Sequence, residues 1–314
     1  MLCFAHVAYQ LEARWAARAT GIAAFQVRSL DELQARIGEA DVLVVSGLWR
    51  DTLLAQAPRL RFIQAIGAGT DQFSRPALQA AGIRLASAAG VNARAVSEHA
   101  MALILALVRR LPEARDNQTR RHWRGMIGDL AGREDELGGK TLAIVGPGRI
   151  GGRLARLARA FDMTTIGVRR DPASGLGDCD EVVALGALKQ VLPRVDFVAL
   201  TCPLTAETEG LMDAAAFAAM RPGAYLINVA RGRCVDEAAL VAALEGGRIA
   251  GAGIDVTVDE PLGAESPLWG MKNVLLTPHT AGETRAYEDN LFDILQDNLG
   301  RLAAGQAALR NQII

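Results

Sequence analysis

The chain has 314 residues, of which 50% are hydrophobic and 22% are charged, and its formal net charge at pH 7 is −1. Because a single hydrophobic core stops growing at about 250 to 300 residues, this length predicts two domains. The near-neutral charge offers no electrostatic basis for binding nucleic acid. The longest apolar run, residues 100–108, is far shorter than the roughly 20 residues that cross a membrane, so we expect no membrane-spanning segment.

The four cysteines, Cys3, Cys179, Cys202 and Cys234, are far apart in the sequence and form no C-x-x-C pair. This spacing suggests neither a zinc site nor a disulfide framework, so we expect no metal and reduced packing cysteines. The N-terminal segment lacks the basic region and the small-residue cleavage site of a secretion signal. We therefore expect a cytoplasmic protein.

Short apolar segments alternate with helical patterns in the first part of the chain. We expect strands near Val7 and over residues 24–27, 42–45 and 62–65, and helices over residues 11–18, after an N-cap at Asp31, and near Thr52. This alternation predicts a parallel sheet covered by helices on both faces.

A loop of small residues, Gly67-Ala68-Gly69, follows the strand at residues 62–65. At the carboxyl end of a parallel strand, successive backbone N–H groups of such a loop can bind a carboxylate. From this segment alone, a plain strand-to-helix turn is an equally good interpretation. One long helix is then expected over residues 93–111, joining two sheets, and we interpret His99 within it as a hydrogen-bonded interior or interface histidine.

A strand, a glycine turn and a helix are predicted over residues 141–161. Gly146, Gly148 and Gly151 fit the pattern G-x-G-x-x-G between an apolar strand and an amphipathic helix. In this context the glycines allow a tight turn, close approach to a phosphate, and close packing of helix on strand. The helix N-terminus attracts an anion, so the segment predicts a dinucleotide diphosphate site.

The α/β alternation then continues to the end of the chain. Further strands are expected over residues 164–168, 197–201, 224–229, 252–256 and 274–277, and a helix over residues 284–304. The predicted fold class is α/β, with two doubly wound parallel-sheet (Rossmann-like) domains and a cleft between them. Since ligands bind at the carboxyl ends of parallel strands, we expect the residues that follow the strands to gather there, namely Arg169, Cys202, Pro203, Ala230, Arg231, Asp255 and His279.

Three ionisable residues follow strands of the second predicted sheet: Arg231, Glu260 and His279. Hydride transfer between a nicotinamide and a carbon that bears a hydroxyl also needs a group that takes or gives the proton, and histidine titrates near neutrality. A neighbouring carboxylate would stabilise the imidazolium and fix the ring's tautomer. An arginine presents a planar fork of donors to a substrate carboxylate and its carbonyl oxygen.

These residues lie in motifs that resemble one known family over nearly the whole chain. The segments GPGRIG, PLTAET, NVARGRCVDEAAL, AGAGIDVTVDEPL and NVLLTPHTAGET look like the D-isomer-specific 2-hydroxyacid dehydrogenases, of the glyoxylate/hydroxypyruvate reductase type. The early loop IGAGTDQF and the segment GVNARAVSEHAMALILAL are similar to that family as well.

The resemblance implies a catalytic set of Arg231, Glu260 and His279, with Asp255 near the nicotinamide carboxamide. The implied substrate-binding residues are Leu48, Ala68, Gly69, Arg231 and His279, where the apolar character of Leu48 and Trp49 is equally compatible with packing. The expected cofactor-binding residues are Gly146, Gly148, Arg149, Ile150, Gly151, Arg169, Arg170, Pro203, Thr208, Val229, Ala230, Arg231, Asp255 and His279.

The resemblance also implies how the domains are organised. A discontinuous substrate-binding domain would comprise residues 1–98 plus 286–314, and a dinucleotide-binding domain residues 99–285. The family implies a homodimer joined through the cofactor domains, with the region around Trp123 near the partner subunit.

One departure concerns the end of the strand at residues 164–168, where an NAD enzyme would place an acid for the ribose hydroxyl. Here Arg169 and Arg170 follow, and two guanidinium groups would attract a 2′-phosphate, so NADP(H) is favoured over NAD(H). Asp171 keeps NAD(H) open, because a small shift in register would let it reach the ribose.

The expected activity is reduction of a small 2-oxoacid such as glyoxylate or hydroxypyruvate. A dinucleotide-sensing regulator without turnover is the alternative from another class, although a sensor would not need proton-transfer residues. A formate- or phosphite-oxidising relative is a closer alternative, against which Glu260 argues. The identity of the substrate side chain and the physiological direction stay open.

Overall fold

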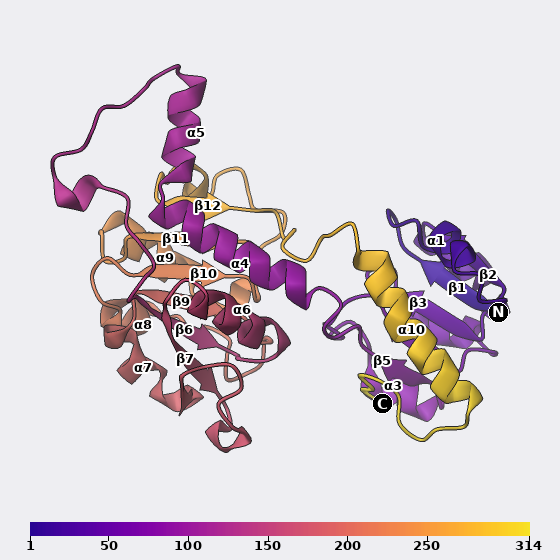
Figure 1. Ribbon diagram of the computed structural model, residues 1–314. Coiled ribbons are helices and arrows are strands. Elements are labelled where there is room, and N and C mark those ends of the chain that lie inside the picture. The colour runs from indigo at the N-terminus through magenta and orange to yellow at the C-terminus, as the bar shows by residue number, and fades with distance from the viewer. The chain divides into compact units, whose positions relative to one another are not determined.

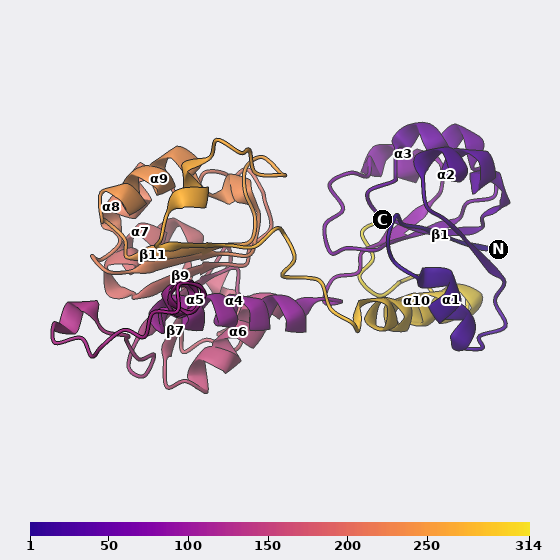
Figure 2. The same cartoon turned by 90° about the horizontal axis from the view of Figure 1, so that it is seen from above.

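The computed structural model describes residues 1–130 and 132–314 in full, and the chain divides into two compact units (Figure 1). The first unit comprises Met1–Asn92 with Glu283–Ile314, and the second comprises Ala93–Gly282. Each unit contains one parallel sheet with helices on both faces (Figure 2). The predicted class, α/β with two doubly wound parallel sheets, is confirmed.

The first unit is built on five parallel strands in the order β2-β1-β3-β4-β5. Its strands are β1 (Leu2–Ala5), β2 (Ala24–Val27), β3 (Val42–Val45), β4 (Phe62–Ala65) and β5 (Arg84–Ala86), and its helices are α1 (Leu11–Ala17), α2 (Leu30–Arg36), α3 (Arg75–Ala80) and α10 (Tyr287–Ala303). Figure 2 shows α2 and α3 on one face of the sheet and α1 and α10 on the other. The strand order reverses between β1 and β3.

The second unit is built on seven parallel strands in the order β12-β11-β10-β9-β6-β7-β8. Its strands are β6 (Thr141–Val145), β7 (Thr164–Arg169), β8 (Glu181–Ala184), β9 (Phe197–Leu200), β10 (Tyr225–Asn228), β11 (Gly251–Ile254) and β12 (Val274–Leu276). The order reverses between β6 and β9, which is where an open α/β sheet binds its ligand.

The helices of the second unit separate onto the two faces of its sheet. They are α4 (Ala93–Val108), α5 (Leu111–Thr119), α6 (Arg149–Arg159), α7 (Leu188–Val191), α8 (Ala214–Ala219) and α9 (Glu237–Glu245). In Figure 2, α7, α8 and α9 cover one face, and α4 and α6 cover the other. Both faces are buried, which explains why strands such as β6 and β9 are continuous apolar runs rather than alternating ones.

Several local expectations are corrected by the structure. The first strand is Leu2–Ala5 rather than the region of Val7, which is 62% exposed. Ser29, not Asp31, caps α2, because its hydroxyl accepts the N–H of Glu32. Near Thr52 the chain forms a 3₁₀ turn rather than an α-helix. The short strands β5 and β8 were not expected from the sequence.

The helix expected over residues 93–111 is α4, which ends at Val108, and a further helix, α5, follows it. Arg110 has a left-handed backbone with φ of 52°, and α5 begins again at Leu111 with Pro112 in its first turn. Pro112 has no N–H to donate to the preceding turn, so a continuous helix would lose a bond there. Figure 1 shows α5 and the loop after it projecting from the rest of the second unit.

The division between the units falls before α4 and after Gly282, rather than at the residues 98 and 285 suggested above. Residue 98 lies inside α4, and the whole of α4 lies in the second unit. In the part of the chain that the structure describes, no helix is long and apolar enough to cross a membrane.

Candidate active site

The three glycines of the turn after β6 meet three different requirements. Gly146 has φ of 88°, and a Cβ there would lie 2.7 Å from Cα of Cys202. A Cβ on Gly151 would lie 2.6 Å from the carbonyl oxygen of Gly146, so this glycine lets α6 pack closely on the turn. Gly148 caps α6 and faces open space. The space in front of a helix N-terminus fits a diphosphate.

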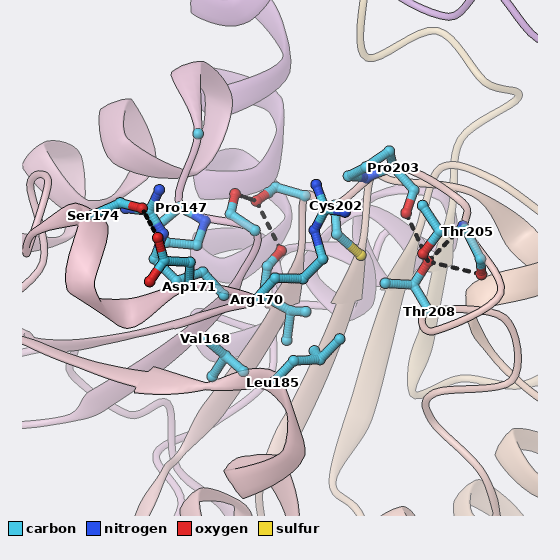
Figure 3. Close-up of a pocket in the computed structure, with 15 residues that line it drawn as sticks. Pro147, Val168, Arg170, Asp171, Ser174, Leu185, Cys202, Pro203, Thr205 and Thr208 are labelled. Atoms are coloured by element: carbon cyan, nitrogen blue, oxygen red, sulfur yellow. Dashed lines mark hydrogen bonds between the residues drawn. The ribbon is translucent and has the colours of Figure 1, made fainter.

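A cavity of about 490 Å³ lies where the chain leaves β6, β7 and β9, at the reversal of the strand order. Among the residues expected to bind cofactor, those that line it are Gly146, Gly148, Arg169, Arg170, Pro203 and Thr208. Those that do not line it are Arg149, Ile150, Gly151, Val229, Ala230, Arg231, Asp255 and His279. In Figure 3, Asp171 and Ser174 lie at one end of the cavity, Thr205 and Thr208 lie at the other, and Arg170 lies between them.

Arg169, Arg170 and Asp171 lie at the end of β7, and their side chains differ in the hydrogen bonds that they form. Both carboxylate oxygens of Asp171 are engaged by the turn that follows it, one by an N–H at 3.0 Å and one by the Ser174 hydroxyl at 2.7 Å. The Ser174 hydroxyl lowers the pKa of Asp171 below its usual value. Arg169 donates to a backbone carbonyl of the same turn. Arg170 is exposed and forms no hydrogen bond or ion pair with any described residue.

His279 and Glu260 come together in the second unit. Nδ1 of His279 lies 2.7 Å from Oε2 of Glu260, and both side chains are partly exposed. Because Nδ1 faces the carboxylate, Nε2 is the ring nitrogen left for another partner. The other carboxylate oxygen of Glu260 accepts the N–H of Thr257 at 3.2 Å, which fixes the acid's orientation.

Asp255 fastens the loop that carries His279. Its side chain is 3% exposed, and its oxygens accept the N–H groups of Thr280 and Ala281 at 3.0 to 3.2 Å. Its backbone carbonyl accepts the N–H of His279 at 2.8 Å. The Thr277 hydroxyl donates to Oδ1 of Asp255 at 2.6 Å. The carboxylate of Asp255 is thus occupied by the loop after β12, which carries His279.

Arg231 stands on a rigid turn after β10. Asn228 braces this turn, since its amide donates to the carbonyl of Arg231 and accepts the N–H of Ala230. A Cβ on Gly232 would lie 1.9 Å from the carbonyl oxygen of Thr257. The loop of Arg231 and the loop that leads to Glu260 are therefore in direct contact.

A second cavity, of about 540 Å³, adjoins the His279–Glu260 pair. Its lining is mostly apolar, and the residues that form it are Asp255, Thr257, Glu260, Pro261, Leu262, Trp269, Leu276, Thr277, Pro278 and His279. Three expected site residues, Asp255, Glu260 and His279, therefore share this cavity rather than the one beside the glycine turn.

In the first unit, the small-residue loop after β4 leaves two backbone donors open. The Ser46 hydroxyl accepts the N–H groups of Ile66 and Gly67 at 3.2 and 3.3 Å. The N–H groups of Ala68 and Gly69 have no acceptor among the described residues. The loop can therefore offer two neighbouring donors to an anion.

Leu48 and Trp49, the apolar pair near this loop, differ in their burial. Trp49 is 1% exposed and packs against Phe73 in the core, so its apolar character reflects packing. Leu48 is only partly buried and packs against the same core.

The chain matches known proteins over most of its length. Residues 101–281 match the family described as D-isomer specific 2-hydroxyacid dehydrogenase, NAD binding domain. A glyoxylate/hydroxypyruvate reductase B from Yersinia enterocolitica is 36% identical over 280 residues, which cover 85% of this chain and 82% of the relative. The chain belongs to the D-isomer-specific 2-hydroxyacid dehydrogenase family.

Two further members place the chain within this dehydrogenase family. A D-3-phosphoglycerate dehydrogenase from Mycobacterium bovis is 36% identical over 285 residues, which cover 88% of this chain but 52% of the relative. The chain thus spans about half the length of such relatives. A crystal structure of a D-isomer specific 2-hydroxyacid dehydrogenase family protein from Aeromonas salmonicida is 30% identical, covers 100% of this chain and 98% of its own, and has a TM-score of 0.86.

The sequence did not point to several residues that line or support these candidate sites. Thr277 and Ser46 each follow a strand directly, and a hydroxyl at a strand end is a signal that could have pointed to them. Leu185 and Ser174 also line the first cavity, but nothing in their sequence surroundings distinguishes them from ordinary loop residues. His99 is hydrogen-bonded as expected, with Nε2 lying 2.9 Å from the Thr277 hydroxyl.

Proposed function

We propose that this chain reduces a small 2-oxoacid, of the glyoxylate or hydroxypyruvate type, with NADPH as hydride donor. The observation that carries the proposal is the 2.7 Å contact between His279 and Glu260 in a dehydrogenase-family unit. In the reduction, His279 donates a proton from Nε2 to the oxygen that was the 2-oxo group. Glu260 holds Nδ1, so the ring keeps its orientation and its positive charge is stabilised.

The remaining binding roles follow from the donors that the chain offers. We assign Arg231 to the substrate carboxylate and the carbonyl oxygen, because its planar fork binds two oxygens at once and polarises the carbonyl. We assign the open N–H groups of Ala68 and Gly69 to the carboxylate as well, and Leu48 to the substrate side chain. The bound nicotinamide cofactor would supply the hydride.

The preference for NADP(H) rests on the end of β7. The carboxylate of Asp171 is committed to its own turn, whereas Arg170 faces the cavity with no partner among the described residues. A guanidinium in this place suits the 2′-phosphate of NADP(H), while an uncommitted acid would suit the ribose hydroxyls of NAD(H).

We further propose a homodimer that forms through the second unit. Large apolar side chains are exposed along residues 111–130, with Trp123 97% and Met126 101% exposed. The segment projects from its unit (Figure 1). Exposed apolar patches of this kind mark protein interfaces, and a second copy of the chain would cover this one.

The deciding experiment mixes the purified protein with NADPH or NADH and a panel of 2-oxoacids, and follows the absorbance of the reduced nicotinamide. We expect turnover with small 2-oxoacids and a higher kcat/KM with NADPH. Cofactor binding without any turnover would instead support a dinucleotide-sensing regulator. A clear preference for NADH would reject the NADP(H) assignment, and R169D should lower any NADPH preference.

A further inference from the structure

A chain of hydrogen bonds connects α4 to the loop that carries His279. Nε2 of His99 lies 2.9 Å from the Thr277 hydroxyl, and this hydroxyl lies 2.6 Å from Oδ1 of Asp255. Asp255 in turn holds the N–H groups of Thr280 and Ala281. The chain of bonds therefore ends on the two residues that follow His279.

The distances assign a direction to these bonds. A separation of 2.6 Å is typical of a hydroxyl that donates to an ionised carboxylate. A threonine hydroxyl has only one hydrogen, and here it points to Asp255, so the Thr277 oxygen must accept from His99. His99 is therefore protonated on Nε2. Nε2 of His99 lies 3.7 Å from Oδ1 of the buried Asp255 carboxylate.

The loop needs such a support because its backbone is strained. His279 has φ of 54°, a left-handed conformation that a non-glycine residue rarely adopts. Conformations of this kind are unfavourable and persist only where surrounding bonds hold them. The bonds that oppose the strain run from residues 279, 280 and 281 to Asp255.

The helix α4, on which the series of hydrogen bonds begins at His99, is held firmly in the second unit. Glu98, next to His99, forms an ion pair with Arg153 of α6 at 2.8 Å. Further along α4, Leu103 packs so closely on β11 that a Cβ on Gly253 would lie 2.9 Å from it. His99 is thus a donor on a helix whose position relative to the sheet is set independently of the loop.

We propose that His99 is a positioning residue: through Thr277 and Asp255 it holds His279 in the conformation that directs the ring toward Glu260 and the substrate. The proposal rests on the proposed function, in which His279 transfers the proton. His99 itself does not touch the substrate.

The first test needs no activity. The chain has four histidines, so a long-range ¹H–¹⁵N correlation spectrum of labelled protein can be assigned with H99Q as reference. At a pH where histidines are neutral, we expect His99 to carry its proton on Nε2. Protonation on Nδ1 instead would overturn the chain of bonds. If the wild-type protein shows the Nε2 proton on His99 but has no activity, the proposed function is rejected while the series of hydrogen bonds from His99 is supported.

The second test uses paired variants. H99L and T277V each remove one link at similar volume, and we expect each to lower kcat by about 10- to 100-fold, as small misplacements of catalytic groups do. H99Q and T277S keep a donor or a hydroxyl and should restore most of kcat. The double variant H99L/T277V should be no slower than the slower single variant, because both changes break the same chain.

Matched controls separate positioning from general stability. S97A removes a buried hydroxyl of α4 that bonds only within its helix, and it should leave kcat unchanged even if the melting temperature falls. Wild-type kcat in both H99L and T277V, or losses in the double variant that multiply, would overturn the proposal.

Discussion

Nδ1 of His279 and Oε2 of Glu260 lie 2.7 Å apart, although the two residues belong to different loops of the second unit. One loop follows β12 and the other follows β11, and these strands are neighbours in the sheet. The two side chains can meet because the strands are neighbours and because His279 has a left-handed backbone. Nε2 of His279 is therefore the ring nitrogen left for another partner.

Removing this ring should stop proton transfer without disturbing the dinucleotide cavity, which His279 does not line. We expect H279A to lower kcat by about 10²- to 10⁴-fold, the usual contribution of general acid–base catalysis. Fluorescence titration with NADPH should give an unchanged Kd. E260Q keeps an acceptor for Nδ1 and should lose less activity than E260A. An H279A variant with wild-type kcat would reject the assignment.

Arg170 should control the choice between the two cofactors. R170A is expected to raise KM for NADPH by roughly 10-fold while KM for NADH hardly changes, because a charge-assisted bond to the 2′-phosphate is worth about 1.5 to 3 kcal/mol. Steady-state kinetics with both cofactors measures this. R153A, on the same unit but paired to Glu98, is the control. Equal changes with the two cofactors would contradict the role.

Ser46 should act on substrate binding alone. S46A removes the hydroxyl that accepts the N–H groups of Ile66 and Gly67, so the neighbouring loop loses its fixed orientation. We expect KM for the 2-oxoacid to rise by about 2- to 10-fold, the value of one or two net hydrogen bonds, with KM for NADPH unchanged. S46T should behave like the wild type. A rise in KM for NADPH instead would show a general defect.

Trp123 should stabilise a dimer. W123S is expected to weaken self-association, so that sedimentation equilibrium shows a larger monomer fraction at the same concentration. W269S is the matched control, since Trp269 is also exposed, at 59%, but lies in another part of the second unit. A wild-type protein that sediments as a monomer, or equal behaviour of W123S and the wild type, would contradict the interface.

Asp213 should contribute to the acid sensitivity of the fold. It caps α8 by accepting the N–H of Ala216 at 2.6 Å and also pairs with Lys189. These contacts, the N–H first, lower the pKa of Asp213 below its usual value. Its stabilising effect is therefore complete above about pH 4 and is lost as the pH falls through the lowered folded-state pKa.

Urea unfolding at a series of pH values tests this sign. D213N keeps a capping oxygen that does not titrate, so the difference in unfolding free energy between wild type and D213N should shrink as the pH falls from about 5 to 3. D213A should lose about 1 kcal/mol at neutral pH. A difference that grows on acidification would show that the contact does not involve the carboxylate.

The sequence by itself determined the fold class and the segments of the site. Apolar runs such as β6 and β9 can be recognised in the sequence because both faces of a parallel sheet are buried. Gly146 and Gly151 can be recognised because a Cβ at either position would clash with neighbouring atoms. Such local requirements restrict which residue types can occupy a position. They do not specify partners that are distant in the chain.

The tertiary structure decided what those residues touch. It showed that the Asp171 carboxylate is hydrogen-bonded within its own turn, whereas the Arg170 side chain has no such partner. The residue types of two adjacent polar positions do not predict this difference. It brought His99 to Thr277 across 178 positions of the chain. It also showed Trp49 buried and Trp123 exposed. Burial and long-range hydrogen bonds arise only when strands and helices pack, so residue type alone does not determine them.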